Sequence, residues 1–249
     1  MSQTLLLLLI LAGLAGLSYF DKRAYGAFRL VEDSARRRAF YWGWTWIPFI
    51  AFGVGGLGLL ASIGSLDALY RLPAEFAVLR PAIAPPATVD TSSDGYLLGV
   101  VIGAGLALAI AISLWALRIR KMILPVVGDI EPLLPRNNAE IAQAIPMAIN
   151  AGLSEELYFR LALPLLATHV TGSALAGFAI ACAAFALVHW YQGWKGMLAV
   201  FAVGVWLSWL YLATGSLLKP ILVHILIDLV ALVVRPAIAL HFRRRAAAA

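Results

Sequence analysis

The chain has 249 residues, of which 62% are hydrophobic and only 13% are charged, and its mean hydropathy is +0.88. This composition excludes an ordinary soluble globular protein and predicts a polytopic membrane protein surrounded by the lipid bilayer. The net charge of +6 does not require nucleic acid as a partner, because membrane proteins collect Lys and Arg on their cytoplasmic side. The single cysteine, Cys182, excludes an internal disulfide.

Seven apolar stretches that are long enough to cross a bilayer as helices follow one another along the chain. The first has no basic residue before it and ends at Tyr19-Phe20, so we expect an uncleaved helix. The predicted fold is an all-α membrane bundle that forms a single domain, residues 1–249. The expected spans are about 4–20, 41–64, 95–117, 140–167, 172–190, 196–213 and 217–240.

The distribution of basic residues predicts the orientation of this bundle. With the N-terminus outside, only Arg71, Arg80 and Lys219 lie on the outer side, and Arg160 lies within the membrane. All other Lys and Arg residues then fall in cytoplasmic connections, as the positive-inside rule requires. The C-terminus is therefore expected in the cytoplasm.

Two connections are rich in proline. Residues 65–94 contain four prolines, which predicts an exposed loop on the outer side. Residues 118–139 form the main cytoplasmic connection, and Asn138 near its end can begin the next helix. Pro146 could kink that helix, as prolines do next to membrane cavities.

Two carboxylates and a guanidinium lie within six residues inside the fourth apolar stretch, where unpaired charges are costly, and such residues indicate a functional site. Glu156 and Arg160 are four residues apart and share a helix face, so they can pair. Glu155 points about a quarter turn away from Glu156, which leaves its carboxylate free for chemistry. The alternative is an ion network with a purely structural role.

Two histidines also lie inside apolar stretches. His189 ends the fifth stretch, and His224 in the seventh precedes Asp228 by one helical turn on the same face. A single histidine on an apolar helix is more often a packing residue, but three stretches that all carry ionisable groups predict convergence on one cavity. His169 and His241 fall where solvent can reach them, so we expect no catalytic role for either.

The order Glu-Glu-x-x-x-Arg, Phe-x-x-x-His and His-x-x-x-Asn/Asp resembles the CAAX protease and bacteriocin-processing family, also called the abortive-infection family of intramembrane proteases. In this chain the three motifs are Glu155–Arg160, Phe185–His189 and His224–Asp228. The resemblance covers about residues 138–235.

The resemblance implies a glutamate-dependent endopeptidase that acts inside the membrane. Glu155 would be the general base that activates water, and His189 would share that water. Glu156 and Arg160 would hold the site together, with Phe185 as a further orienting residue. Residues 126–245 would then form the catalytic core and residues 1–125 the accessory N-terminal helices.

The resemblance also implies that His224 stabilises the oxyanion together with its motif partner. Asp228 stands where the eukaryotic motif has Asn, and an ionised carboxylate cannot donate a hydrogen bond to an oxyanion. Asp228 must either stay protonated or act by fixing His224, and we expect the second role.

Several alternatives remain open from the sequence. A catalytic zinc ion could bind two histidines and a carboxylate, but the chain has no His-Glu-x-x-His pair, and we expect no cofactor. A non-catalytic membrane scaffold or immunity protein of the same fold is the main alternative function. A transporter with Glu155 and Asp228 as a proton relay would be expected to show an inverted repeat, which the sequence lacks.

The expected substrate is a membrane-associated protein or peptide, such as a leader peptide. The expected location is the inner membrane of a bacterium. The sequence does not predict an oligomeric state or a cleavage rule.

Overall fold

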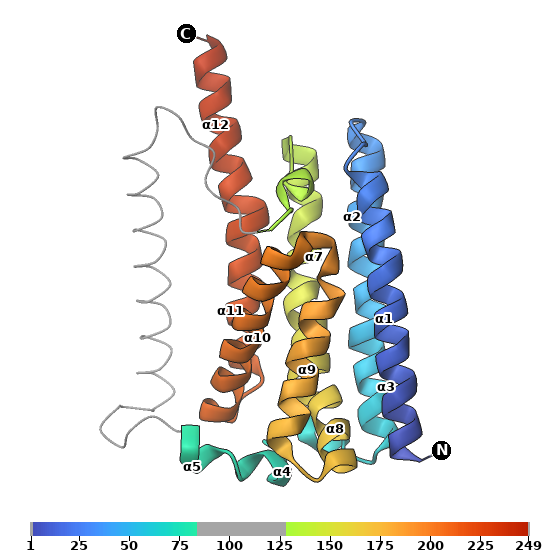
Figure 1. Cartoon of the computed structure of the whole chain (residues 1–249). Helices are drawn as coiled ribbons and strands as arrows, with labels where there is room; N and C mark the ends of the chain where they lie inside the picture. The colour runs from blue at the N-terminus through green and yellow to red at the C-terminus, as the bar shows by residue number, and fades with distance from the viewer. Residues whose placement is uncertain (1, 84–127, 249) are drawn as a thin grey trace, which may run out of the picture.

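The computed structural model describes residues 2–83 and 128–248, which form helices and connecting turns without a strand. The long helices run side by side in a bundle, with the two termini at opposite ends (Figure 1). The predicted all-α fold is therefore confirmed for these residues. The expected third span, residues 95–117, lies outside the described part of the chain.

Four helices in the described part of the chain are long and apolar enough to cross a membrane. They are Gln3–Phe28, Ser34–Ser62, Trp190–Thr214 and Leu218–Arg245. These helices support an integral membrane protein. The number of seven spans and the orientation of the termini stay predictions.

Several helix ends follow from local sequence. The side chains of Ser2, Asp33, Asn137 and Ser173 each accept a hydrogen bond from a first-turn amide, as N-cap residues do. At the other ends, Gly172 and Gly215 adopt left-handed conformations with φ of 70° and 68°.

The described bundle consists of α1 (Gln3–Phe28), α2 (Ser34–Pro48), η1 (Phe49–Val54), α3 (Gly55–Ser62), α7 (Asn138–Glu156), η4 (Leu157–Ala162), α8 (Leu163–Thr171), α9 (Ala174–Val188), η5 (Trp190–Gln192), α10 (Gly193–Thr214), α11 (Leu218–Leu229), η6 (Val230–Val234) and α12 (Arg235–Ala248).

Three of the long helical rods contain a π-helical segment. These segments are η1 between α2 and α3, η4 between α7 and α8, and η6 between α11 and α12. The helix that contains Pro146 is uninterrupted up to Glu156, so the break falls at η4 rather than at the proline. Such π segments are frequent at functional sites, and η4 begins directly after Glu156.

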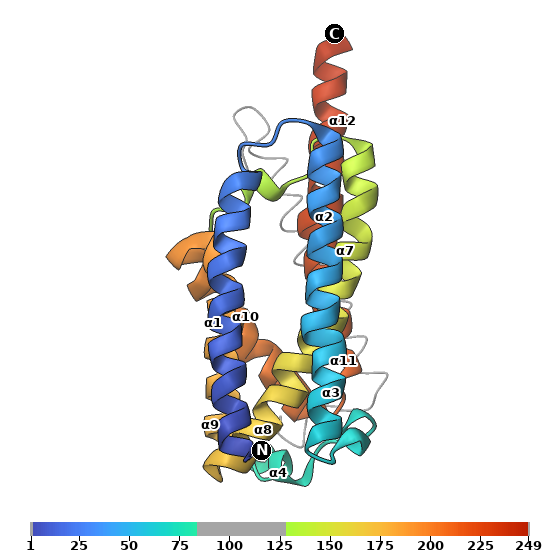
Figure 2. The ribbon, with the colours of Figure 1, turned by 90° about the vertical axis from the view of Figure 1, so that its right-hand side faces the viewer.

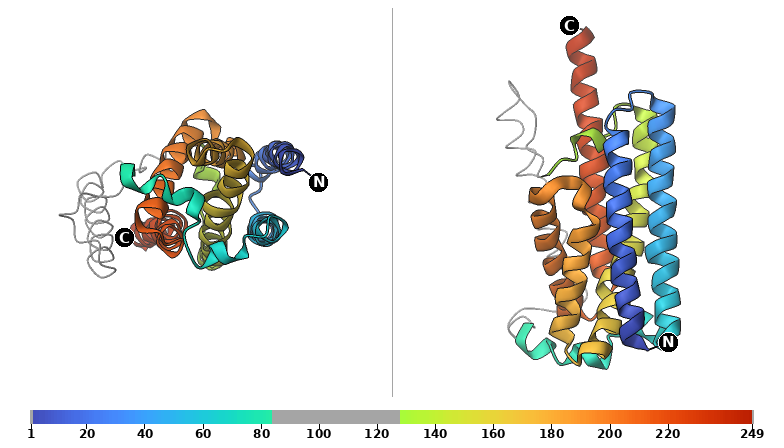
Figure 3. Two further views of the ribbon diagram at one scale, coloured as in Figure 1. Left: turned by 90° about the horizontal axis from the view of Figure 1, so that it is seen from below. Right: turned by 45° about the vertical axis from the view of Figure 1, so that its right-hand side comes forward.

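The outer connection is only partly the exposed loop that its prolines predict. It forms η2 (Leu66–Leu69), α4 (Ala74–Ala77) and α5 (Arg80–Ile83), which run across one end of the bundle from α3 towards α10 and α11 (Figure 3). Phe76 is fully buried and its ring contacts those of Phe178 and Tyr211. The expectation of an exposed loop is therefore wrong at this anchor, and residues 84–94 lie outside the described part.

α7 is the helix that brings the later spans together, because it packs against both α2 and α11. At Gly152, an added Cβ would lie 2.5 Å from Ile225 Cγ1 and 2.9 Å from the Ile225 backbone nitrogen. Only glycine allows this close approach. It places the end of α7 directly beside α11, which carries His224.

A short strap, residues 128–137, crosses the end of the bundle where α1 and α2 are joined. Figure 2 shows α1 standing apart from the rod of α2 and α3, connected to it at this end. The Asp129 amide donates to the Gln192 carbonyl (2.8 Å), and the Tyr25 hydroxyl donates to the Asp129 carbonyl (2.6 Å). The strap is therefore tied to α1 and to η5.

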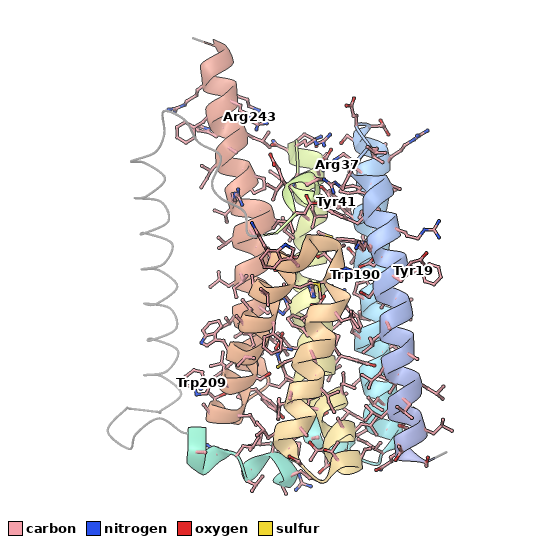
Figure 4. All side chains as sticks on the ribbon, in the orientation of Figure 1. Tyr19, Arg37, Tyr41, Trp190, Trp209 and Arg243 are labelled. Carbon is pink, nitrogen blue, oxygen red and sulfur yellow. The ribbon has the colours of Figure 1, made fainter. Side chains whose placement is uncertain are left out.

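Arg37 ties the other end of the strap to α2. The charge pattern counts Arg37 among the basic residues of the cytoplasmic side, and in the structure its side chain is fully buried. It donates to the carbonyls of Pro132 and Leu134 and forms an ion pair with Glu140 at 3.0 Å. Figure 4 shows Arg37 and Tyr41 near this end of the bundle. The strap thus covers a buried charge.

Candidate active site

Glu155 and His189 face each other across the centre of the bundle. Glu155 lies in the last turn of α7, and His189 directly follows α9. The Glu155 Oε2 and His189 Nε2 atoms are 3.9 Å apart, and both side chains are largely buried. This distance is too long for a direct hydrogen bond, and Glu155 Oε2 has no hydrogen-bond partner among the described residues.

The backbone fixes which nitrogen of His189 faces Glu155. His189 Nδ1 lies 2.8 Å from the Phe185 carbonyl, one turn earlier in α9. Since a carbonyl oxygen only accepts, Nδ1 must carry the proton of this hydrogen bond. In the neutral imidazole, Nε2 then presents a lone pair towards Glu155.

Glu156 points to a different partner, His224 of α11. Its Oε1 atom lies 2.7 Å from His224 Nδ1, and its Oε2 atom lies 3.1 Å from Arg160 Nε. The side chains of Glu156 and Arg160 are both fully buried. The guanidinium also lies 4.4 Å over the Phe185 ring, so this one network connects α7, η4, α9 and α11.

Asp228 lies beside the outer nitrogen of His224, without a direct hydrogen bond. The distance from Asp228 Oδ2 to His224 Nε2 is 3.8 Å, beyond hydrogen-bond range. Glu156, at 2.7 Å from Nδ1, is therefore the carboxylate that orients the ring. The expectation that Asp228 acts by fixing His224 stays a prediction, because the two side chains form an ion pair when the imidazole is protonated, and the sequence did not indicate the contact between Glu156 and His224.

One cavity of about 150 Å³ collects these groups. Glu155, His189, His224 and Asp228 all line it, together with residues of α1, α2, η1, η5, η6 and the strap. These four motif residues come from α7, the end of α9, and α11, and they share one space. The space is large enough for a few water molecules or part of a peptide. Their catalytic roles stay predictions.

Sequence reasoning missed a further acid at this cavity, Asp21 of α1. Asp21 comes just after the first apolar stretch, where a charge is ordinary at a helix end. The available signal was helical spacing, because Asp21, Tyr25 and Phe28 lie on one face and the two aromatic residues are buried. The helix continues to Phe28 and carries Asp21 into the bundle.

The two histidines for which no catalytic role was expected lie elsewhere. His169 Nε2 is 3.2 Å from Glu75 Oε1, and His241 lies in α12. Among the described residues, no group of three His, Cys, Asp or Glu side chains is arranged to hold a metal ion. The expectation of a site without a cofactor stays a prediction.

Comparison with family models gives a match over the part of the chain that carries the three motifs. Residues 137–230 match the family model described as type II CAAX prenyl endopeptidase Rce1-like. The search of curated proteins and the search of solved structures gave no match. The match confirms the resemblance carried by the three motifs, all of which lie within these residues, and it supports a protease embedded in a membrane.

Proposed function

We propose that this chain is an intramembrane endopeptidase that uses Glu155 as its general base, with no metal ion. The observation that carries the proposal is the pair of Glu155 and His189, whose facing atoms are 3.9 Å apart at the wall of a cavity. Both facing atoms are hydrogen-bond acceptors when the carboxylate is ionised and the imidazole is neutral.

A water molecule fits this pair of acceptors. With hydrogen bonds of about 2.8 Å to Glu155 Oε2 and His189 Nε2, the angle at the water oxygen is about 90°. This is close to the angle between the two O–H bonds of water, so each bond can point at one acceptor. The remaining lone pairs of the water oxygen then face the cavity and can attack a carbonyl carbon.

Peptide hydrolysis follows from these positions. As the water oxygen bonds to the carbonyl carbon, Glu155 takes one proton and the carbonyl oxygen becomes an oxyanion. Glu155 then gives this proton to the nitrogen of the leaving amine when the C–N bond breaks. The products are a carboxylic acid and an amine, and Glu155 is ionised again.

His224 is proposed to stabilise the oxyanion. Its Nδ1 atom is engaged by Glu156, so the nitrogen available to the cavity is Nε2. To donate from Nε2 while Nδ1 donates to Glu156, the imidazole must carry both protons, with Glu156 and Asp228 as its counter-charges. Asp228 is thus proposed as a positioning charge for this imidazolium.

The proposed substrate is a membrane-associated protein or peptide, and the proposed location is a bacterial inner membrane. The motifs lie in helices that converge below the strap, so the cleaved segment must enter the bundle. The buried ion pair of Glu156 and Arg160 is intact, which supports a working active site over a scaffold that has lost its catalytic residues.

The test is cleavage of a pool of membrane peptides by the purified chain in lipid nanodiscs, read by mass spectrometry. Glu155→Gln and His189→Ala should each lower turnover by about 10²–10⁴-fold. The matched control is Glu75→Gln, which alters a carboxylate–histidine pair distant from the cavity and should keep turnover. Unchanged turnover in Glu155→Gln would exclude the mechanism, and a scaffold would retain its binding partner in all three variants.

A further inference from the structure

The cavity has a second polar region, formed by Asp21, Trp44 and Tyr191. These residues come from α1, α2 and η5, and all three line the same cavity as Glu155 and His189. The Trp44 and Tyr191 rings meet edge to face with centroids 4.8 Å apart. The Tyr191 ring lies 5.9 Å from that of His189, so this region adjoins the proposed catalytic pair.

The cavity is acidic, and its proposed cation, the His224 imidazolium, is already paired with Glu156 and Asp228. Asp21, Glu155 and Asp228 line it, and among the described lining residues none is Lys or Arg. The basic residues near Asp21 are engaged elsewhere, since Lys22 Nζ lies 3.9 Å over the Trp190 ring and Arg29 pairs with Asp129 at 2.5 Å. The structure gives Asp21 no basic partner among the residues it describes.

We propose that Asp21, Trp44 and Tyr191 form a binding site for a Lys or Arg side chain of the substrate. The carboxylate would pair with the cation, and the Trp44 and Tyr191 rings, which pack against each other, would line its surroundings in a space shielded from bulk water. This inference rests on the proposed function, because it states that the substrate peptide in the cavity carries a basic residue. A carboxylate placed here would instead meet Asp21 with no Lys or Arg to offset it.

The position of the site relates the cation to the cleaved bond. Tyr191 follows His189 by two residues, and Tyr191, Asp21, Glu155 and Asp228 all line the same cavity. A basic side chain paired with Asp21 beside Trp44 and Tyr191 would therefore come from a residue within a few positions of the bond at Glu155. The site thus selects peptides with Lys or Arg close to the point of cleavage.

Binding is measured first, independently of turnover. Full-length Glu155→Gln protein in nanodiscs is titrated with short apolar peptides that carry one lysine at successive positions. Each peptide has a counterpart in which that lysine is Nε-acetylated and therefore neutral. At the productive position, acetylation should weaken binding about tenfold. In an Asp21→Asn background, the two peptides should bind equally.

The matched control is Glu32→Gln, which removes an exposed acid outside the cavity and should retain the full preference for lysine. Equal binding of lysine and acetyl-lysine peptides by the parent protein would overturn the inference. So would a lysine preference that survives Asp21→Asn. If Asp21→Asn does not fold, the acetylated peptides alone decide, because they alter only the ligand.

Cleavage by the chain with Glu155 intact then separates this inference from the proposed function. Cleavage without any preference for nearby Lys or Arg would refute the basic-residue site and leave the endopeptidase in place. Lysine-dependent binding that needs Asp21, without cleavage of any peptide, would refute the endopeptidase and leave the site in place. Preference in both assays supports the two together.

Discussion

Replacement of Glu156 by Gln is the most direct test of the buried network. The change removes the carboxylate that pairs with Arg160 at 3.1 Å and with His224 at 2.7 Å. Among the described residues, none of the three guanidinium nitrogens of Arg160 has a hydrogen-bond partner, so the ion pair with Glu156 is its charged contact. The guanidinium would then keep only the face of Phe185 beneath it.

The expected cost follows from burial. The side chains of Glu156 and Arg160 are both 0% exposed, and loss of one member of a buried pair costs about 3–5 kcal/mol because the other charge stays buried. In the double variant Glu156→Gln/Arg160→Met, no unpaired guanidinium is left behind, and Asp228 remains 3.8 Å from His224 as its counter-charge. We therefore expect the double variant to be less destabilised than the sum of the single variants, with a coupling energy of about 2–3 kcal/mol.

The assay is reversible unfolding in mixed micelles, followed by tryptophan fluorescence, for the parent, both single variants and the double variant. The matched control is the pair of Asp67 and Arg71, which has the same spacing and order of charges but lies exposed. Its double-mutant cycle should show no measurable coupling. Additive losses at Glu156 and Arg160, or a coupling no larger than that of the exposed pair, would refute the reasoning.

Three further predictions concern packing and the strap. Gly152→Ala should lower the free energy of unfolding by about 1–3 kcal/mol and lower turnover, because the added Cβ would lie 2.5 Å from a side-chain atom of α11. The control Gly16→Ala, whose Cβ would have no atom within 4 Å, should be tolerated in the same unfolding assay. Arg37→Gln should make the strap more than about tenfold more sensitive to limited proteolysis, because the fully buried side chain holds it, and exposed Arg38→Gln should not. Tyr211→Phe should leave the free energy of unfolding unchanged or raise it by up to about 1 kcal/mol, because its buried hydroxyl has no partner among the described residues; a loss would show that the hydroxyl is bonded.

The helical bundle was predictable because lipid imposes one dominant constraint. A membrane helix must be long and apolar, so hydropathy located α10 within a few residues and the starts of α1 and α11 within one residue, whereas α1 and α12 each continue eight residues past the predicted ends. The π segments were not predictable, since no residue pattern distinguishes η4 from an ordinary helical turn. The burial of Phe76 under the outer connection was also hidden, because it depends on α9 and α10.

The candidate site was predictable where charge contradicts the lipid environment. Glu155, His189 and His224 stood out because each lies in an apolar stretch, and helical spacing correctly paired Glu156 with Arg160. Contacts between helices could not be deduced in this way. The bond from Glu156 to His224 spans 68 residues of sequence, and Asp21 reaches the cavity only because α1 packs beside η5.

The tandem acids acquire different environments because the helix turns by about 100° from one residue to the next. Glu156 is directed into the protein, where His224 and Arg160 engage both of its oxygens. It does not line the cavity, whereas Glu155 does. Both oxygens of Glu156 lie beside cationic partners, and its carboxylate is directed away from the space that a substrate would enter. Of the two tandem acids, Glu155 is the one that lines the cavity, and this supports Glu155, rather than Glu156, as the base.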